Sequence, residues 1–95
     1  MISSKQRAAL RAMANELEPI FQLGKDGLGD AFVRQVDEAL EARELVKISI
    51  LRTSEYEPRQ ACDILADKLG AQGVQCIGRK FTLYRPSTKN PRIGI

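Results

Sequence analysis

The sequence contains no histidine, no tryptophan and only two cysteines. Cys62 and Cys76 lie too far apart for a C-x-x-C site, and no histidine is available to complete a set of metal ligands. Both are expected to be small core residues of a protein in a reducing compartment. Lys5 and Arg7 follow the start without an apolar run, so we expect neither a signal peptide nor a membrane span. These absences predict a cytoplasmic protein without metal or cofactor.

Aromatic residues are also scarce, at 5% of the chain. Phe21, Phe32 and Phe81 fall at predicted core positions, and Tyr84 is interpreted in the same way, so Tyr56 in a polar loop is the freest to stack on a base. General acid–base catalysis has few candidates, because histidine is absent and the acids gather on a helix face predicted to be exposed. We therefore expect a non-catalytic protein.

The length and composition indicate one domain. Ninety-five residues with 43% hydrophobic content can bury a core without disulfides or metal. We expect the domain to span residues 1–86 and to be monomeric, with a flexible basic tail over residues 87–95, because the turn-rich segment after Pro86 has too little apolar content to form an element.

Charge is distributed unevenly along the chain. The formal net charge is +3, but residues 1–15 and 78–95 contain basic residues and no acid, whereas acids outnumber bases over residues 30–44. Segregation of this kind can create a surface that attracts a polyanion. Two separately solvated basic ends are the alternative interpretation. The acids of the middle segment are Asp30, Asp37, Glu38, Glu41 and Glu44.

Hydrophobic periodicity predicts the order α-β-α-β-α-β-β. Ser3 or Ser4 can cap the first helix, and Gln6, three residues after Ser3, would complete a capping box. Asp30 is expected to cap the second helix, and Pro58 and Gly70 are expected to bound the third. A strand-helix-strand crossover followed by a terminal hairpin predicts a mixed four-stranded sheet packed with helices, an α/β (α+β) fold. The predicted helices are 4–16, 30–43 and 58–69, and the predicted strands are 20–23, 45–51, 74–77 and 81–84.

The stretch Leu23-Gly24-Lys25-Asp26-Gly27-Leu28 is the most distinctive part of the sequence. Two glycines three residues apart allow backbone amides to approach a phosphate closely, and the loop leads into the positive end of a helix dipole. Two glycines at this spacing more often form only a turn, and the two interpretations are compatible, because a turn forced by glycine would expose the amides. Asp26 would repel a phosphate, so binding by this loop would depend on its amides.

Four segments in order resemble the CRM (chloroplast RNA splicing and ribosome maturation) domain family, in particular its bacterial single-domain, YhbY-like members. They are 4–11, the glycine loop at 23–28, the stretch Leu40-Glu41-Ala42-Arg43-Glu44-Leu45-Val46-Lys47, and 77–86. The resemblance implies a fold similar to the C-terminal domain of initiation factor 3 and association with precursors of the large ribosomal subunit. The candidate RNA-binding residues are Gly24, Lys25, Asp26, Gly27, Arg7, Arg11, Lys47, Arg79, Lys80 and Arg85.

Two functions from different classes follow. The first is a non-catalytic module that binds ribosomal RNA through phosphate contacts in precursors of the large subunit and assists ribosome assembly. The second is a protein-interaction module whose acidic second helix docks a basic ribosomal protein or assembly factor. Binding to naked RNA that weakens with salt distinguishes the first from the second.

Overall fold

The computed structural model describes residues 2–25, 27–89, 91 and 93. Within these residues the elements follow one another in the predicted order, and most begin and end within two residues of the predicted bounds. The helices are α1 (Ser4–Asn15), α2 (Asp30–Arg43) and α3 (Pro58–Leu69), and the strands are β1 (Phe21–Leu23), β2 (Leu45–Ile50), β3 (Gln72–Ile77) and β4 (Lys80–Tyr84).

The helix boundaries follow local capping chemistry. Ser3 Oγ accepts a hydrogen bond from the Gln6 amide over 3.1 Å, and Gln6 Oε1 accepts one from the Ser3 amide over 2.8 Å, which confirms the capping box of α1. Gly70 ends α3 with a φ of +62°, in the left-handed region that favours glycine. The prediction for α2 was wrong by one residue: Gly29 is the N-cap, and Asp30 is the first helical residue. Asp30 still complements the helix dipole from the first turn.

The strands form one mixed sheet in the order β1-β2-β4-β3. β1 and β2 are parallel, whereas β4 is antiparallel to both of its neighbours, β2 and β3. β2 and β3 therefore run in the same direction, as the predicted crossover requires, but β4 lies between them. The register of β3 shifts between Gly73 and Gln75, and the strand begins at Gln72, two residues earlier than predicted. This bulge interrupts the alternation at the start of β3, which explains why the predicted strand began only at residue 74.

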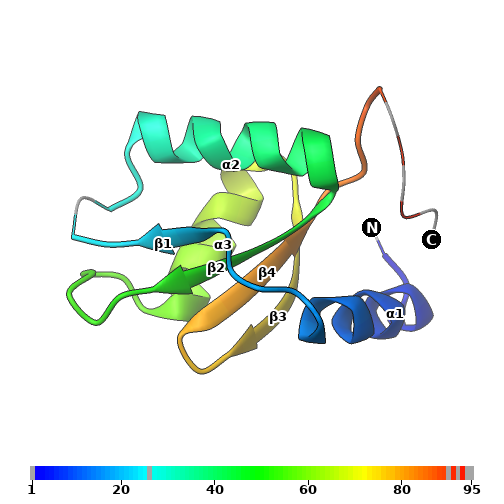
Figure 1. Ribbon diagram of the computed structural model, residues 1–95, viewed down its shortest axis with the longest axis horizontal. Helices are drawn as coiled ribbons and strands as arrows, with labels where there is room; N and C mark the ends of the chain where they lie inside the picture. Colours follow the sequence, from blue (N-terminus) through cyan, green and yellow to red (C-terminus); the bar gives the residue numbers. More distant parts are fainter. Residues whose placement is uncertain (1, 26, 90, 92, 94–95) are drawn as a thin grey trace.

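α2 and α3 lie on one face of the sheet and α1 lies on the other (Figure 1), and each face carries its own apolar cluster. α2 and α3 pack on one face through Val36, Leu40 and Leu65, against the inward side chains of all four strands. α1 packs on the other face, where Leu10 joins a smaller cluster with Leu45, Val74 and Tyr84. On β2 the main core takes Val46, Ile48 and Ile50, as the alternation predicted. α1 contacts mainly β3 and β2.

Candidate nucleic-acid interface

Four adjoining hollows run from the glycine loop, across the face of the sheet that carries α1, to the outer edge of β3. The largest has a volume of about 710 Å³ and lies over the ends of the strands, beside Ser49, Ile77 and Lys80. Neighbouring hollows share lining residues: Gln22 joins the first two, and Ile77 joins the second, third and fourth. We call these hollows together the basic groove. Its basic residues are Arg7, Arg11, Lys47, Arg59, Arg79 and Lys80.

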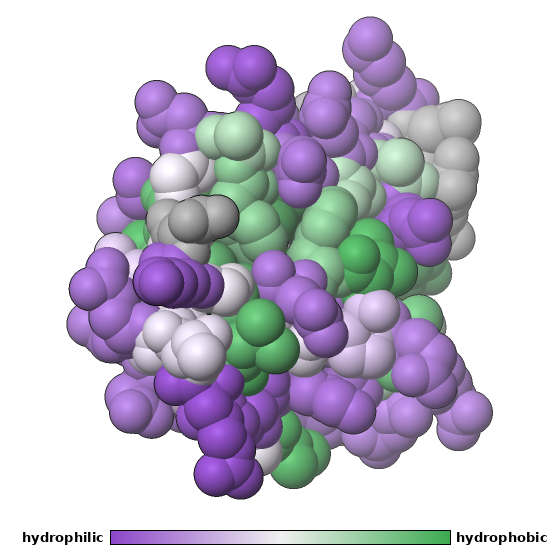
Figure 2. Space-filling view, turned by 60° about the vertical axis from the view of Figure 1, so that its left-hand side comes forward, coloured by the Kyte–Doolittle hydropathy of each residue, from purple (hydrophilic) through white to green (hydrophobic). Residues whose placement is uncertain are grey.

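The charged residues among the described lining of the basic groove are all basic, and they line the second, third and fourth hollows. No acidic residue lines any of the four hollows, within the part of the chain that the structure describes. Apolar side chains contribute to the same surface, and Ile77 is 64% exposed and Leu51 41% exposed. On the face shown in Figure 2, green apolar atoms lie among purple hydrophilic atoms and do not form one large apolar patch. The groove can therefore attract an anion at several points along an otherwise neutral floor.

The first hollow lies between the glycine loop and the start of α2. Gly27 has a φ of +74°, and its amide donates to the Gly24 carbonyl over 3.3 Å, so the loop is a tight turn. A Cβ on Gly27 would lie 3.4 Å from Tyr56 Cε2, and Tyr56 itself packs on the main core. Lys25 is exposed in this loop, whereas Asp26 lies outside the described residues. Gly29, the N-cap of α2, provides no side-chain cap. Among the described residues, no side-chain oxygen therefore caps the first-turn amides where α2 borders the hollow.

The terminal hairpin forms the wall of the largest hollow. Arg79 is tied to the end of β2, because its Nε donates to the Ile50 carbonyl over 3.0 Å and its Nη2 donates to the Leu51 carbonyl over 2.9 Å. These bonds hold one edge of the guanidinium against the backbone. Lys80 is exposed, and its ammonium makes no hydrogen bond or ion pair with another described residue. The hairpin therefore presents one anchored and one unpaired positive charge to the groove.

Lys47 has a structural partner. Its Nζ donates to the carbonyls of Ala14 and Leu17, over 2.9 and 3.3 Å, and so satisfies backbone groups at the C-terminal end of α1. A cation at this end of a helix also interacts favourably with the helix dipole. Lys47 lines the smallest hollow, next to Asn15 and Lys80, but its ammonium is directed to α1. It positions α1 on the sheet in addition to contributing charge.

The fourth hollow lies at the outer edge of β3 and has a volume of about 390 Å³. Arg7 and Arg11 approach it from consecutive turns of α1, and Arg59 approaches it from the first turn of α3. Nη1 of Arg7 donates to the Gly73 carbonyl, which fixes that side chain along the strand. Three arginines from two helices on opposite faces of the sheet therefore line one hollow at this edge.

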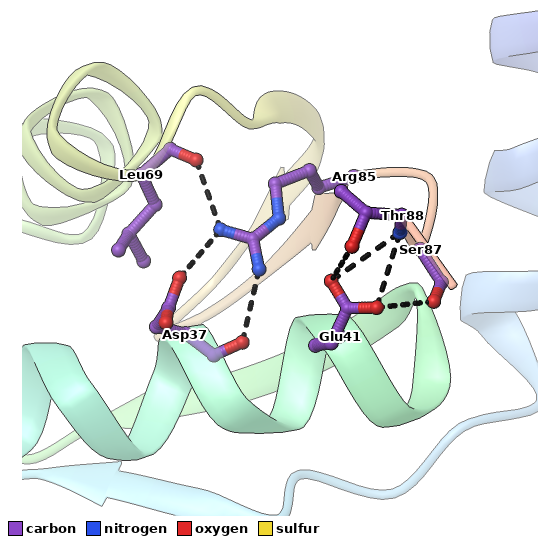
Figure 3. A network of polar contacts seen from close by, with 6 residues as sticks. All are labelled: Asp37, Glu41, Leu69, Arg85, Ser87 and Thr88. Carbon is purple, nitrogen blue, oxygen red and sulfur yellow. Dashed lines mark hydrogen bonds and ion pairs between the residues drawn. The ribbon is translucent and has the colours of Figure 1, made fainter. Parts of the chain in front are cut away.

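Arg85 lies away from the basic groove. Its guanidinium forms an ion pair with Asp37 at 2.7 Å and donates to the backbone carbonyls of Leu69 and Asp37, each over 3.0 Å (Figure 3). The Arg85 side chain is 17% exposed, so its donors are largely committed to joining β4, α2 and α3. This arrangement gives Arg85 a structural role in the described fold.

The C-terminal segment after β4 is held by the acidic helix. Glu41 accepts hydrogen bonds from the Ser87 hydroxyl over 2.5 Å and from the Thr88 amide over 3.1 Å (Figure 3). Glu44 is buried, and its carboxylate accepts from the amides of Ser87 and Ile93, each over 2.8 Å. The Ser87 hydroxyl and the Thr88 and Lys89 amides, together with a second bond from the Thr88 hydroxyl, lower the pKa of Glu41 to about 2, against desolvation. The flexibility expected from residue 87 onward stays a prediction. The described residues of this segment are hydrogen-bonded to α2 and to Glu44, which follows it.

Most residues that the sequence suggested for RNA contact are brought together by the fold. Those that line the basic groove are Gly24, Gly27, Arg7, Arg11, Lys47, Arg79 and Lys80. Sequence reasoning missed Arg59, because charge was examined by segment and this residue lies in a stretch of mixed charge. The position of Arg59 at the start of α3 could have indicated a role in binding, because a cation there interacts unfavourably with the helix dipole. Gln22 and Gln75, which join adjacent hollows, gave no signal.

The described residues offer neither a metal site nor a membrane span. Where the chain is described, no group of three or more His, Cys, Asp or Glu side chains could hold a metal ion. Within the same residues, none of the helices has the length and apolar character needed to span a bilayer.

Comparison with known proteins identifies the class of protein to which this fold and groove correspond. The model of the CRS1 / YhbY (CRM) domain matches residues 2–85, and the chain belongs to this family. It is 42% identical over 95 residues to "Probable RNA-binding protein YqeI" of Bacillus subtilis, covering 100% of this chain and 99% of that protein. It is 30% identical to a Haemophilus influenzae protein named "RNA-binding protein", over 90% of this chain and 87% of the relative.

A solved structure shows the same fold. The solution structure of the hypothetical protein SAV1595 from Staphylococcus aureus superposes with a TM-score of 0.79 at 34% sequence identity. The match covers 95% of this chain and 94% of that chain. The resemblance inferred from the four sequence segments is thus confirmed at the level of family and fold.

Proposed function

We propose that this protein is a non-catalytic RNA-binding module whose basic groove holds the phosphate backbone of RNA. One observation carries the proposal: among the described residues, six basic and no acidic side chains line a groove that crosses all four strands. Neutralising phosphates with Lys and Arg releases counterions, which drives RNA association. Relatives from two bacteria named as RNA-binding proteins, and not as enzymes, support both parts of the proposal.

The kind of RNA follows from what the groove offers. Phe81 is buried, and Phe21 and Phe32 pack against each other edge to face with centroids 6.0 Å apart, so these rings are committed to packing. Tyr56 packs behind the glycine loop. Contacts to phosphates and to backbone shape are then favoured over stacking on single bases, which is typical of structured RNA. From the family resemblance we infer that the RNA is ribosomal and that the protein assists assembly of large-subunit precursors. We also propose that it acts in the cytoplasm as a monomer.

The alternative, docking of a basic protein on the acidic helix, has less support. Asp37 is paired with Arg85, and the carboxylates of Glu41 and Glu44 accept hydrogen bonds from the C-terminal segment. A basic partner would have to displace these contacts or use the remaining acids of α2. The structure thus provides no specific observation that favours this function.

The RNA-binding proposal is tested by reversing two unpaired cations, Arg11→Glu and Lys80→Glu together. Affinity for a labelled RNA hairpin is measured by fluorescence anisotropy over a range of salt concentrations. The slope of log K against log salt is expected to become shallower by about 0.7 to 0.9 for each phosphate that the protein no longer neutralises. Lys68→Glu, on α3 outside the four hollows, is the control and should retain the parental slope. Binding by the parental protein that does not change with salt would refute the proposal.

The ribosomal part of the proposal requires a separate experiment. Crosslinking the protein in cells and sequencing the attached RNA should recover large-subunit ribosomal RNA, and this recovery should decrease in the double variant. Recovery of other RNA species only would retain RNA binding and reject ribosome assembly.

A further inference from the structure

Arg59 occupies an unusual position for a surface arginine. It lies in the first turn of α3, where the partial positive charge of the helix dipole disfavours a cation. It is exposed, and its guanidinium forms no hydrogen bond or ion pair with another described residue. Its charge therefore has no hydrogen-bonded or ion-paired partner among the described residues. A charge without such a partner in the fold is a candidate for contact with a ligand.

The neighbours of Arg59 indicate what that ligand is. Arg7 and Arg11 line the same hollow of about 390 Å³, and the Arg11 guanidinium is also without a hydrogen bond or ion pair to the described residues. Guanidinium groups match phosphate and carboxylate oxygens with paired N–H donors. Three arginines that line one hollow, with no acid among the described residues of its lining, fit a ligand that carries several negative charges.

The edge of β3 distinguishes between the two candidate ligands, an acidic peptide and a nucleic-acid backbone. A peptide would bind by adding a strand, which needs a regular row of free backbone groups. The bulge between Gly73 and Gln75 interrupts that row, and Arg7 already occupies the Gly73 carbonyl. Both features are ones that proteins use to prevent strand addition at an edge. The observations thus favour phosphate.

We propose that Arg59, Arg7 and Arg11 form a phosphate-binding site at the outer edge of β3, which anchors RNA at a second point. This site rests on the proposed RNA-binding function and extends it around the sheet onto α3. The sheet separates it from the hollow beside the glycine loop, by about 15 Å at three strand spacings. One RNA backbone that crosses the sheet can therefore contact both ends of the basic groove.

The test compares Arg59→Glu with Lys68→Glu, which makes the same charge change on the same helix outside the four hollows. Anisotropy with a labelled RNA hairpin should show about fivefold weaker binding for Arg59→Glu and a slope shallower by about 0.7 to 0.9. Lys68→Glu should show neither change. Arg59→Lys keeps the charge and should keep the slope. Thermal unfolding of Arg59→Glu should occur at the parental temperature or above it, since an acid in the first turn suits the dipole.

Each outcome has a distinct meaning. If Lys80→Glu weakens RNA binding while Arg59→Glu leaves both affinity and slope unchanged, the site at β3 is rejected and the proposed function stands. If the parental protein does not bind the hairpin, the proposed function itself fails. Polyglutamate serves as the acidic-peptide probe: binding of polyglutamate but not RNA, with dependence on Arg59, would overturn the choice of phosphate.

Discussion

Individual glycines in the first hollow have different physical roles. Gly27 needs its hydrogen side chain, because its φ is +74° and Tyr56 lies directly behind it. Gly29 has an extended backbone with φ −73° and ψ 169°, and a Cβ there would meet nothing within 4 Å. In a variant at Gly27, weaker RNA binding could therefore result from backbone strain and not from a lost phosphate contact. Gly29 is the position at which the hollow can be changed without disturbing the fold.

Gly29→Asp and Gly29→Ser form a matched pair that tests this end of the groove. Both side chains can cap α2, so each variant should be more stable than the parent by a few tenths, about 0.3 kcal/mol, in urea unfolding. Only the aspartate places a carboxylate over the first turn of α2 and should weaken RNA binding. If both variants bind RNA like the parent, the first hollow is not part of the RNA site.

At the scale of elements, α1 is joined to the sheet by a small cluster and a few polar contacts. Leu10 provides the apolar contact, Arg7 bonds to the β3 backbone, and Lys47 bonds to the carbonyls at the end of the helix. Lys47 thus belongs to the packing of α1 as much as to the groove.

Lys47→Met retains the aliphatic stem of the side chain and removes the ammonium. We expect a decrease of about 1 to 2 kcal/mol in the free energy of unfolding in urea, because the carbonyls of Ala14 in α1 and of Leu17 just after it no longer have a charged donor. Hydrogen exchange should accelerate in α1 more than in α2. Unchanged stability combined with a shallower salt slope for RNA would assign Lys47 to phosphate contact and not to positioning of α1.

The C-terminal segment is a second element whose docking depends on charge. Glu44 anchors it from an unusual backbone conformation with a φ of +67°, and Glu41 accepts its hydroxyl and amide donors. A non-glycine residue in this region is strained, and the bonds made by Glu44 offset that strain.

Acid should release this segment. The pKa of Glu41 is lowered from 4.5 to about 2 in the folded state, chiefly by the Ser87 hydroxyl and next by the Thr88 amide. Its contribution to stability is complete above about pH 4.5 and is lost as the pH falls toward 2. The NMR signal of the Thr88 amide should report detachment across this range. Glu41→Gln should abolish the titration, and an unaltered pH profile in that variant would exclude Glu41 as the cause.

For the whole molecule, opposite charges are separated onto different surfaces. The basic groove crosses one face of the sheet, while α2 lies on the other face. There Asp37 is paired with Arg85, and the carboxylates of Glu41 and Glu44 accept hydrogen bonds from the C-terminal segment. The modest net charge of +3 therefore conceals a groove in which every formal charge among the described lining residues is positive. Salt dependence of RNA binding should reflect the groove and not the net charge.

The stability of the whole fold should need neither metal nor disulfide. Cys62 and Cys76 are both free, and burial raises the pKa of the Cys62 thiol to about 11, which keeps it protonated and unreactive. A chelator or a reductant should leave the thermal unfolding midpoint unchanged, and sedimentation should give the 10.6 kDa of one chain. A midpoint that rises with protein concentration would instead indicate a dimer.

Much of the fold was predictable from the sequence because its signals are local. The Ser3 and Gln6 capping box, the alternation along β2 and Gly70 after α3 each act over a few residues, and each was found in the structure. The order of four segments along the chain was likewise sufficient to indicate the family.

The tertiary structure alone decided which charges meet. Local pattern does not determine that β4 inserts between β2 and β3, since strand order depends on pairing between residues far apart in the chain. That order makes β3 an edge, and the packing of α1 and α3 on opposite faces brings Arg59 beside Arg7 and Arg11. The same long-range packing turns Lys47 toward α1 and Arg85 toward Asp37. A basic residue can be read from the sequence, but its partner depends on which distant segments pack beside it in the folded chain.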